Sequence, residues 1–130
     1  MLDADPQVRV VVITGSGNKA FSAGGDIHEM ASSTPDEVAD GRALITKFGW
    51  SLAKFRLPII GALNGLAYGG GAFLAAALDI RIGCERTRLR FLGAQYGRLN
   101  STWSLPLIVG WSRAKDLLFS ARVIEAEEAA

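Results

Sequence analysis

Two short runs of β-branched and aliphatic residues give the chain its clearest hydrophobic pattern. Val8–Thr14 is almost continuously apolar and ends at a glycine, and Ile59–Leu63 repeats this pattern before Asn64 and Gly65. Runs of this length without polar alternation are typical of strands in a parallel sheet, where helices cover both faces. We therefore predict two buried, parallel strands.

The segment between these strands carries a helical pattern with a strong start signal. Thr34 is expected to cap the helix, Pro35 to occupy its first turn, and Glu37 to complete a capping box. Apolar residues then recur at helical spacing and form one stripe: Val38, Ile45, Phe48, Leu52 and Phe55. The helix should end before Pro58. Strand, long helix and strand together predict a right-handed βαβ unit.

Shorter elements are expected after the second strand. Consecutive glycines open a short, wholly apolar helix over Ala72–Leu78, and Asp79–Gly83 is expected to be a third strand. Residues 91–100 show no regular pattern, whereas Ser104–Val109 and Arg113–Phe119 are predicted helices. The whole pattern predicts an α/β fold, with residues 1–130 in a single domain.

Two glycine-rich loops each lead from a predicted buried strand to a helix start. The first contains Gly24 and Gly25, and the second contains Gly69, Gly70 and Gly71. Glycine lets the backbone approach a ligand closely, and helix N-termini present unpaired N–H groups with a partial positive charge. Two such ends that meet would bind a negatively charged oxygen. One donor of this kind is worth about 100- to 1,000-fold in rate when the charge forms only in the transition state.

The sequence around both loops resembles the crotonase, or enoyl-CoA hydratase/isomerase, family. The first matching segment is Lys19–Ile27, KAFSAGGDI. The second joins Pro58–Gly65, PIIGALNG, to Gly69–Gly71 and then to Leu78–Arg81, LDIR. The resemblance covers nearly the whole chain. It implies a crotonase-like β-β-α superhelix, usually assembled as trimers or dimers of trimers. The chain would then be a partial spiral core, a fragment that lacks N-terminal and C-terminal parts.

The resemblance also implies roles for individual residues. The N–H groups of Gly25 and Gly70 would bind the thioester oxygen of an acyl-CoA and stabilise an enolate. Coenzyme A would enter as part of the substrate, with no separate cofactor, and the backbone near Ala23 would face its adenine end. The other residues that we assign to the substrate or coenzyme A site are Gly24, Asp26, Ile27, Tyr68, Gly69, Gly71, Phe73 and Gln95.

Two positions depart from the pattern of crotonase-type hydratases, which use two glutamates as acid and base. The resemblance places the first glutamate at Phe73, three residues after Gly70, and the second at Gln95. A phenyl ring cannot transfer a proton, and an amide is not a useful acid or base at neutral pH. No Asp or Glu lies between Glu85 and Asp116, so a shifted alignment does not restore one. The exact reaction therefore stays open.

Several other polar and aromatic residues are weaker candidates for the site. His28, the single histidine of the sequence, could meet a coenzyme A phosphate or act as a base. Asp26 is expected to cap the start of a helix. The remaining candidates could line the acyl pocket or border the acyl chain: Tyr96, Asn100, Ser101, Thr102 and Trp103.

Composition and charge narrow the classes of partner. There are 14 basic and 13 acidic residues without a basic stripe, which argues against a nucleic-acid or membrane-surface binder. The single cysteine, Cys84, predicts a reducing, cytoplasmic compartment, and the acidic N-terminus does not resemble a signal peptide. No His, Cys or carboxylate cluster has the spacing of metal ligands. The longest apolar run, Leu66–Leu78, is too short to span a bilayer.

Two other functions stay open at this point. Gly15, Gly17 and Ala20 follow a predicted strand with the spacing of a dinucleotide-binding motif. That motif requires a helix to begin within the glycines, and Ser22 and Gly24 would break such a helix. The second alternative is a non-catalytic module that binds a CoA ester or serves only in assembly, which the replaced glutamates favour.

Overall fold

The computed structural model describes residues 4–26, 28, 32–98 and 101–130, and its elements follow a repeated order in which two strands precede a helix. The first such unit is β1 (Val11–Thr14), β2 (Ala20–Ser22) and α2 (Pro35–Ala53). The second is β3 (Ile59–Leu63), β4 (Leu66–Tyr68) and α3 (Gly70–Ala77). The third begins with β5 (Ile80–Gly83) and β6 (Arg88–Arg90). The remaining elements are η2 (Gly93–Tyr96), α4 (Leu105–Val109), α5 (Trp111–Ser120), β7 (Ile124–Glu125) and α6 (Ala126–Ala129).

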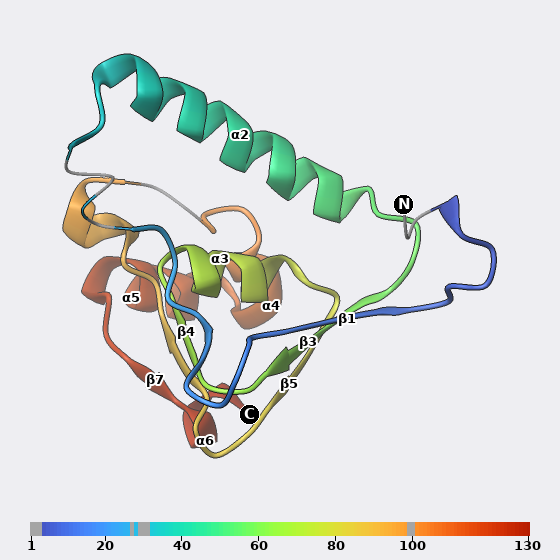
Figure 1. The fold of residues 1–130 in the computed structure, drawn as a ribbon. Coiled ribbons are helices and arrows are strands. Elements are labelled where there is room, and N and C mark those ends of the chain that lie inside the picture. Colours follow the sequence, from blue (N-terminus) through green and yellow to red (C-terminus); the bar gives the residue numbers. More distant parts are fainter. Residues whose placement is uncertain (1–3, 27, 29–31, 99–100) are drawn as a thin grey trace.

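Each unit adds one strand to each of two sheets. The first strands form a parallel sheet in the order β1-β3-β5, and the second strands form a sheet in the order β2-β4-β6-β7. Only β7 runs antiparallel to its neighbour within these described sheets. In Figure 1, α3 lies at the centre of the molecule and α2 runs above it. The predicted βαβ unit is confirmed, because β1 and β3 pair in parallel on either side of α2 in the chain.

The start of α2 matches the sequence prediction. The Thr34 backbone N–H donates to the Glu37 carboxylate at 2.7 Å, and the Glu37 N–H donates to the Thr34 hydroxyl at 3.4 Å, which completes the capping box. The predicted apolar stripe is only partly buried, since Ile45 is 54% exposed and Phe48 is 44% exposed.

Two core clusters lie on different sides of α3. The first joins α3 to the β1-β3-β5 sheet and contains Phe21, Ile59, Leu63, Ala67, Ala75 and Leu78. The second joins α3 to the C-terminal helices and contains Ala72, Ala76, Phe91, Leu105, Ala114, Leu117 and Ile124. The short apolar helix is therefore buried because it contributes small side chains to both clusters.

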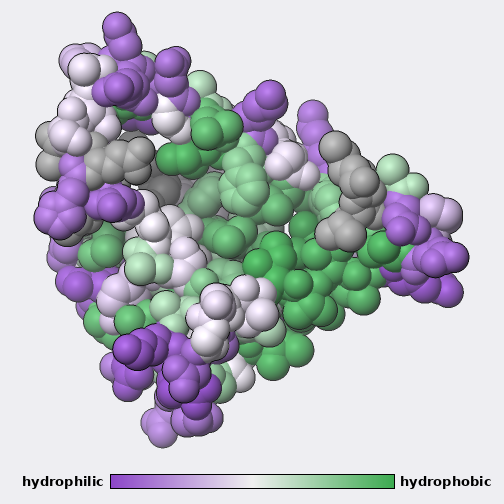
Figure 2. Space-filling model, viewed as in Figure 1, coloured by the Kyte–Doolittle hydropathy of each residue, from purple (hydrophilic) through white to green (hydrophobic). Residues whose placement is uncertain are grey.

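The expectation that the β1-β3-β5 strands are covered on both faces is wrong for the described residues. Val12, Ile80 and Ile82 are each more than half exposed. Leu52 of α2 and Leu74 of α3 both pack in the cluster on the other face, so neither helix covers this one. Figure 2 shows the resulting apolar surface running from the centre to the right, where Figure 1 places these strands.

β2 and β4 are among the strands that the sequence pattern did not predict. β2 and β4 fall within the segments that we predicted as glycine-rich loops, and they pair with each other in parallel. Each has three residues, which is too short to show strand periodicity.

Cys84 is half-buried rather than part of the core, and its thiol donates to the Leu63 carbonyl at 3.6 Å.

Gly71 fixes how closely α3 approaches β2, and its replacement tests that contact. A Cβ atom added at Gly71 would lie 2.1 Å from the Ser22 carbonyl oxygen. We expect Gly71→Ala to lower the free energy of unfolding by more than about 3 kcal/mol, because backbone must move. Urea denaturation followed by circular dichroism measures this. Gly41→Ala in α2 is the control, since no atom lies within 4 Å of the added Cβ; equal stability of the two variants would contradict the contact.

The capping box gives α2 a defined response to acid. The Thr34 backbone N–H and hydroxyl lower the pKa of Glu37 below its ordinary value of 4.5. Because the folded-state pKa lies below the unfolded value, the stabilisation is complete above pH 4.5 and is lost as the pH falls through the lower pKa. We expect Glu37→Gln to lower the melting temperature at pH 7 and to have little effect at about pH 2, well below the unfolded pKa. A difference that does not change with pH would contradict this.

Candidate functional site

The two glycine loops meet through their backbones. A Cβ atom added at Gly24 would lie 2.7 Å from the Tyr68 carbonyl oxygen and 2.9 Å from the Gly70 nitrogen. Gly24 also has a φ of +91°, which side-chain-bearing residues rarely adopt. Both the backbone conformation and the available space therefore require glycine at this position.

Gly70 is the first residue of α3 and lies beside the first loop. A Cβ atom added there would lie 3.4 Å from the Gly24 Cα and 3.7 Å from the Gly25 nitrogen. The first N–H groups of a helix have no acceptor within the helix. Gly25 and Gly70 are both exposed. The structure thus brings the two backbone segments that carry the predicted donors next to each other.

Gly69 anchors the start of α3 to the second sheet. Its N–H donates to the Arg90 carbonyl of β6 at 2.9 Å, and its own carbonyl accepts the Phe73 N–H at 3.0 Å. Its φ of +52° turns the chain from β4 into the helix. Gly69 therefore positions the helix start, and its own N–H is already engaged.

Asn64 joins the segment after β1 to the end of β3. Its side-chain carbonyl accepts the Gly15 N–H at 3.0 Å, and its amide donates to the carbonyls of Gly15 at 3.0 Å and Gly17 at 2.7 Å. This amide orients the chain that leads to the first glycine loop. The sequence pattern identified Asn64 only as the residue after the second predicted strand, although an asparagine in that place can bind backbone groups of a neighbouring loop.

Two side chains at the end of the first loop accept hydrogen bonds from the backbone. The Asp26 carboxylate accepts the His28 N–H at 2.8 Å, which is a bond that an N-cap residue makes. Gly24 donates its N–H to the Ser22 hydroxyl at 3.3 Å. Ala23, Asp26 and His28 are exposed, whereas Ile27 lies outside the described residues.

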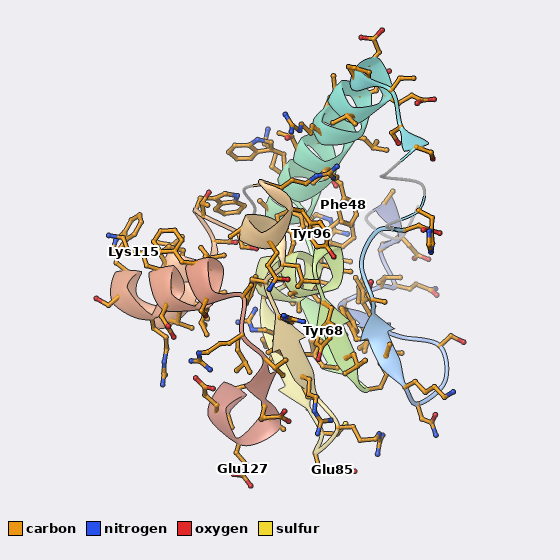
Figure 3. The ribbon with its side chains drawn as sticks, turned by 90° about the vertical axis from the view of Figure 1, so that its left-hand side faces the viewer. Phe48, Tyr68, Glu85, Tyr96, Lys115 and Glu127 are labelled. Atoms are coloured by element: carbon orange, nitrogen blue, oxygen red, sulfur yellow. The ribbon has the colours of Figure 1, made fainter. Side chains whose placement is uncertain are left out.

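The predicted residues beyond the glycines lie on three different elements. Tyr68 ends β4 and is half-buried, and Phe73 is half-buried in α3, on the side of α2. Gln95 and Tyr96 are exposed in η2, and the Gln95 side chain forms no hydrogen bond to the other described residues. Figure 3 shows Tyr68 and Tyr96 on separate elements of the same side of the molecule.

The segment before α4 holds the other predicted candidates. Ser101 is 1% exposed with a φ of +54°, and the hydroxyls of Ser101 and Ser104 are buried without a hydrogen-bond partner in the described part of the chain. Thr102 is exposed, and Asn100 lies outside the described residues. Trp103 stacks on Trp50 of α2, with ring centroids 6.4 Å apart and planes at 9°, so this segment is joined to α2.

Other kinds of site find no support in the residues that the structure describes. Gly15–Lys19 contains no helix, and the chain enters β2 at Ala20, so the dinucleotide-binding arrangement does not form. No group of three or more His, Cys, Asp or Glu in the described ranges could hold a metal ion. No helix among the described residues is both long and apolar enough to cross a membrane.

Comparison with known proteins gives one consistent relationship. A family model described as enoyl-CoA hydratase/isomerase matches residues 1–130. Crotonyl-CoA hydratase of Syntrophomonas wolfei is 40% identical over 129 residues, which covers 96% of this chain and 49% of that protein. Human mitochondrial methylglutaconyl-CoA hydratase is 34% identical, covering 98% of this chain and 39% of the relative. The chain thus spans half or less of the length of these relatives.

Solved structures agree with the sequence matches. An enoyl-CoA hydratase from Bacillus anthracis superposes with a TM-score of 0.93 at 34% identity, covering 98% of this chain and 51% of that one. An enoyl-CoA hydratase from Thermoplasma volcanium gives a TM-score of 0.89 at 33% identity, covering 98% of this chain and 52% of that chain. These likenesses confirm the crotonase-like α/β fold that the sequence predicted, and the chain belongs to the enoyl-CoA hydratase/isomerase family.

Proposed function

We propose that the protein binds an acyl-CoA thioester and stabilises the enolate of its acyl group, with the N–H groups of Gly25 and Gly70 as donors to the thioester oxygen. One observation carries this proposal: the backbone of the first loop lies against the first residue of α3, so that an added Cβ at Gly24 would lie 2.9 Å from the Gly70 nitrogen. Family membership supports it, since the crotonyl-CoA and methylglutaconyl-CoA hydratases act on such thioesters by their names.

The chemistry explains why two fixed donors are useful. Loss of a proton next to a thioester carbonyl moves negative charge onto the carbonyl oxygen. Donors that already point to that oxygen need no reorganisation when the charge appears, and each contributes about 3 to 4 kcal/mol to the transition state. The Gly69–Arg90 hydrogen bond and the Gly71–Ser22 contact hold the start of α3 and would keep one donor in place.

The proton-transfer group is a separate part of the proposal. Neither Phe73 nor Gln95 can act as an acid or base at neutral pH. We therefore propose a reaction that does not use the two-glutamate hydration chemistry, such as isomerisation, decarboxylation or thioester hydrolysis of the same substrate class. The same two residues favour the alternative, a module that binds the CoA ester without turnover.

The remaining assignments follow from the proposed substrate. Coenzyme A arrives as part of the thioester, with the exposed backbone near Ala23 on its adenine side and no separate cofactor. We propose a homotrimer or a hexamer as the assembled form.

We also propose a cytoplasmic compartment, which the single cysteine suggests. The human relative is named as mitochondrial.

Gly24→Ala tests the proposed site, with Gly17→Ala as a matched control. Both glycines have positive φ, +91° and +76°, so alanine is strained at both positions. At Gly17 the added Cβ meets no atom within 4 Å, whereas at Gly24 it meets the second loop. We expect Gly24→Ala to weaken butyryl-CoA binding by about fivefold or more, and to slow turnover of an accepted thioester by about 100-fold or more, because the donors move apart.

Isothermal titration of each variant with butyryl-CoA and with free coenzyme A measures this effect. Gly17→Ala should lose stability but keep its affinity for butyryl-CoA. Equal affinities of Gly24→Ala and Gly17→Ala for butyryl-CoA would contradict the oxyanion assignment. Binding that is normal in the unmodified protein but never accompanied by turnover of any thioester would favour the binding module.

A further inference from the structure

A cavity of about 440 Å³ lies on the side of α3 that faces the C-terminal helices. Residues of α3, β5, β6, α4, α5, β7 and α6 line it. Figure 3 shows α5, which carries Lys115, and α6, which carries Glu127, on two sides of this region. The lining includes no residue of either glycine-rich loop, so the cavity is separate from the proposed thioester site. Its size lies within the range of about 300 to 1,000 Å³ that is usual for sites of small organic ligands.

The inner wall of the cavity is apolar and belongs to the core. Phe91, Leu117 and Ile124 line it, and each is at most 5% exposed. All three belong to the core cluster that joins α3 to the C-terminal helices. Packing holds core side chains of this kind in fixed rotamers, so the wall is formed before a ligand arrives. Water gains no hydrogen bonds from such a wall, and a hydrocarbon chain displaces it favourably.

Two arginines lie at the edge of this apolar wall. The Nη1 group of Arg81 donates to the Leu78 carbonyl at 2.6 Å and to the Ala75 carbonyl at 3.3 Å, which fixes the guanidinium beside the end of α3. The side chain of Arg113 in α5 also lines the cavity, and it forms no hydrogen bond or ion pair with the other described residues. Both guanidinium groups therefore have N–H donors left for a ligand.

Glu128, the acidic side chain of the described lining, is already paired. Its carboxylate accepts two hydrogen bonds from Arg122, at 2.6 and 2.7 Å. These bonds, and more weakly the charge of Arg113, hold the pKa of Glu128 below its ordinary value of 4.5. Because Arg122 neutralises the charge of Glu128, the charges of Arg81 and Arg113 leave this edge of the cavity positive at neutral pH.

An apolar wall with a positive edge fits a ligand that has a hydrocarbon chain and an anionic end. Guanidinium groups bind carboxylates through short, charge-assisted hydrogen bonds. An apolar cavity of about 150 Å³ holds a molecule of the size of benzene, so this cavity accommodates a chain of about eight carbon atoms.

We propose that the cavity binds a medium-chain alkyl carboxylate. The hydrocarbon chain lies against Phe91 and Leu117, and the carboxylate lies at the guanidinium groups of Arg81 and Arg113. The proposed acyl-CoA function is not required for this binding, because the two sites share no residue.

Isothermal titration of the protein with octanoate, butyrate and octylamine at pH 7 tests the proposal. Octanoate should bind at least about tenfold more tightly than butyrate, because four more methylene groups leave water. Octylamine has the same chain with a positive charge and should bind at least about tenfold more weakly than octanoate, because the arginines repel it. The proposal is wrong if octanoate does not saturate the protein, or if octylamine or butyrate binds equally well.

Two neighbouring residues of α4 show whether octanoate occupies this cavity. Ile108 lines the cavity and is 44% exposed, so a larger side chain there can fill the space without disturbing the core. Leu107 is 82% exposed and does not line the cavity. Ile108→Trp should weaken octanoate binding by about tenfold or more, whereas Leu107→Trp should match the unmodified protein. Equal octanoate affinities of these two variants would place the ligand elsewhere and overturn the proposal.

A second pair of variants tests the role of the positive edge. Arg113→Gln removes one charge from the cavity and should weaken octanoate binding by about tenfold. Arg86→Gln is the matched control, because Arg86 pairs with Glu85 and does not line the cavity. Identical octanoate affinities of Arg113→Gln and Arg86→Gln would contradict the assignment of the carboxylate to this edge.

Discussion

The approach of the first glycine loop to the start of α3 is the contact on which the rest of the structure depends. At Gly24 and again at Gly71, a single methyl group would collide with backbone of the neighbouring segment. Backbone atoms cannot move aside as the end of a flexible side chain can. The pairing of β2 with β4 and the packing of α3 against β2 therefore both require glycine at these positions.

The packing of α3 holds the residues of this contact in fixed positions. The helix is short and apolar, and a helix of its length is marginal in isolation, so its stability comes from packing. Small side chains let it lie between two core clusters. Its ends are held by hydrogen bonds, from Gly69 to the Arg90 carbonyl and from Arg81 to the Leu78 carbonyl. The exposed first residue of the helix, Gly70, is thus fixed by the whole fold.

Local sequence signals were sufficient to predict the elements that are stabilised by interactions between neighbouring residues. The capping box at Thr34 and Glu37, the β3 strand and the helix after Gly69 all form as predicted, because neighbouring residues determine them. β2 and β4 were missed because three-residue strands carry no periodicity and are stabilised by pairing with distant partners. The exposed outer face of β1-β3-β5 was missed because an apolar run indicates burial without saying what provides the cover.

The candidate site was also predicted only in the parts that local sequence determines. The glycine motifs and their resemblance to a known family identified Gly25 and Gly70, and the structure brings their segments together. The spacing of residues could not show that Gly24 touches Gly70, or that Phe73 lies against Gly49 of α2, because these pairs are far apart in the chain. The open acid–base positions at Phe73 and Gln95 were visible from the sequence, but the packing of the Phe73 ring was not.

The most direct test of the proposed site is the carbonyl stretching band of a bound thioester. Butyryl-CoA labelled with ¹³C at the thioester carbonyl can be followed by infrared difference spectroscopy on mixing with the protein. Two N–H donors at the oxygen polarise the carbonyl bond, so the account predicts that the labelled band moves to lower frequency on binding. Saturable binding with the band at its position in water would contradict it.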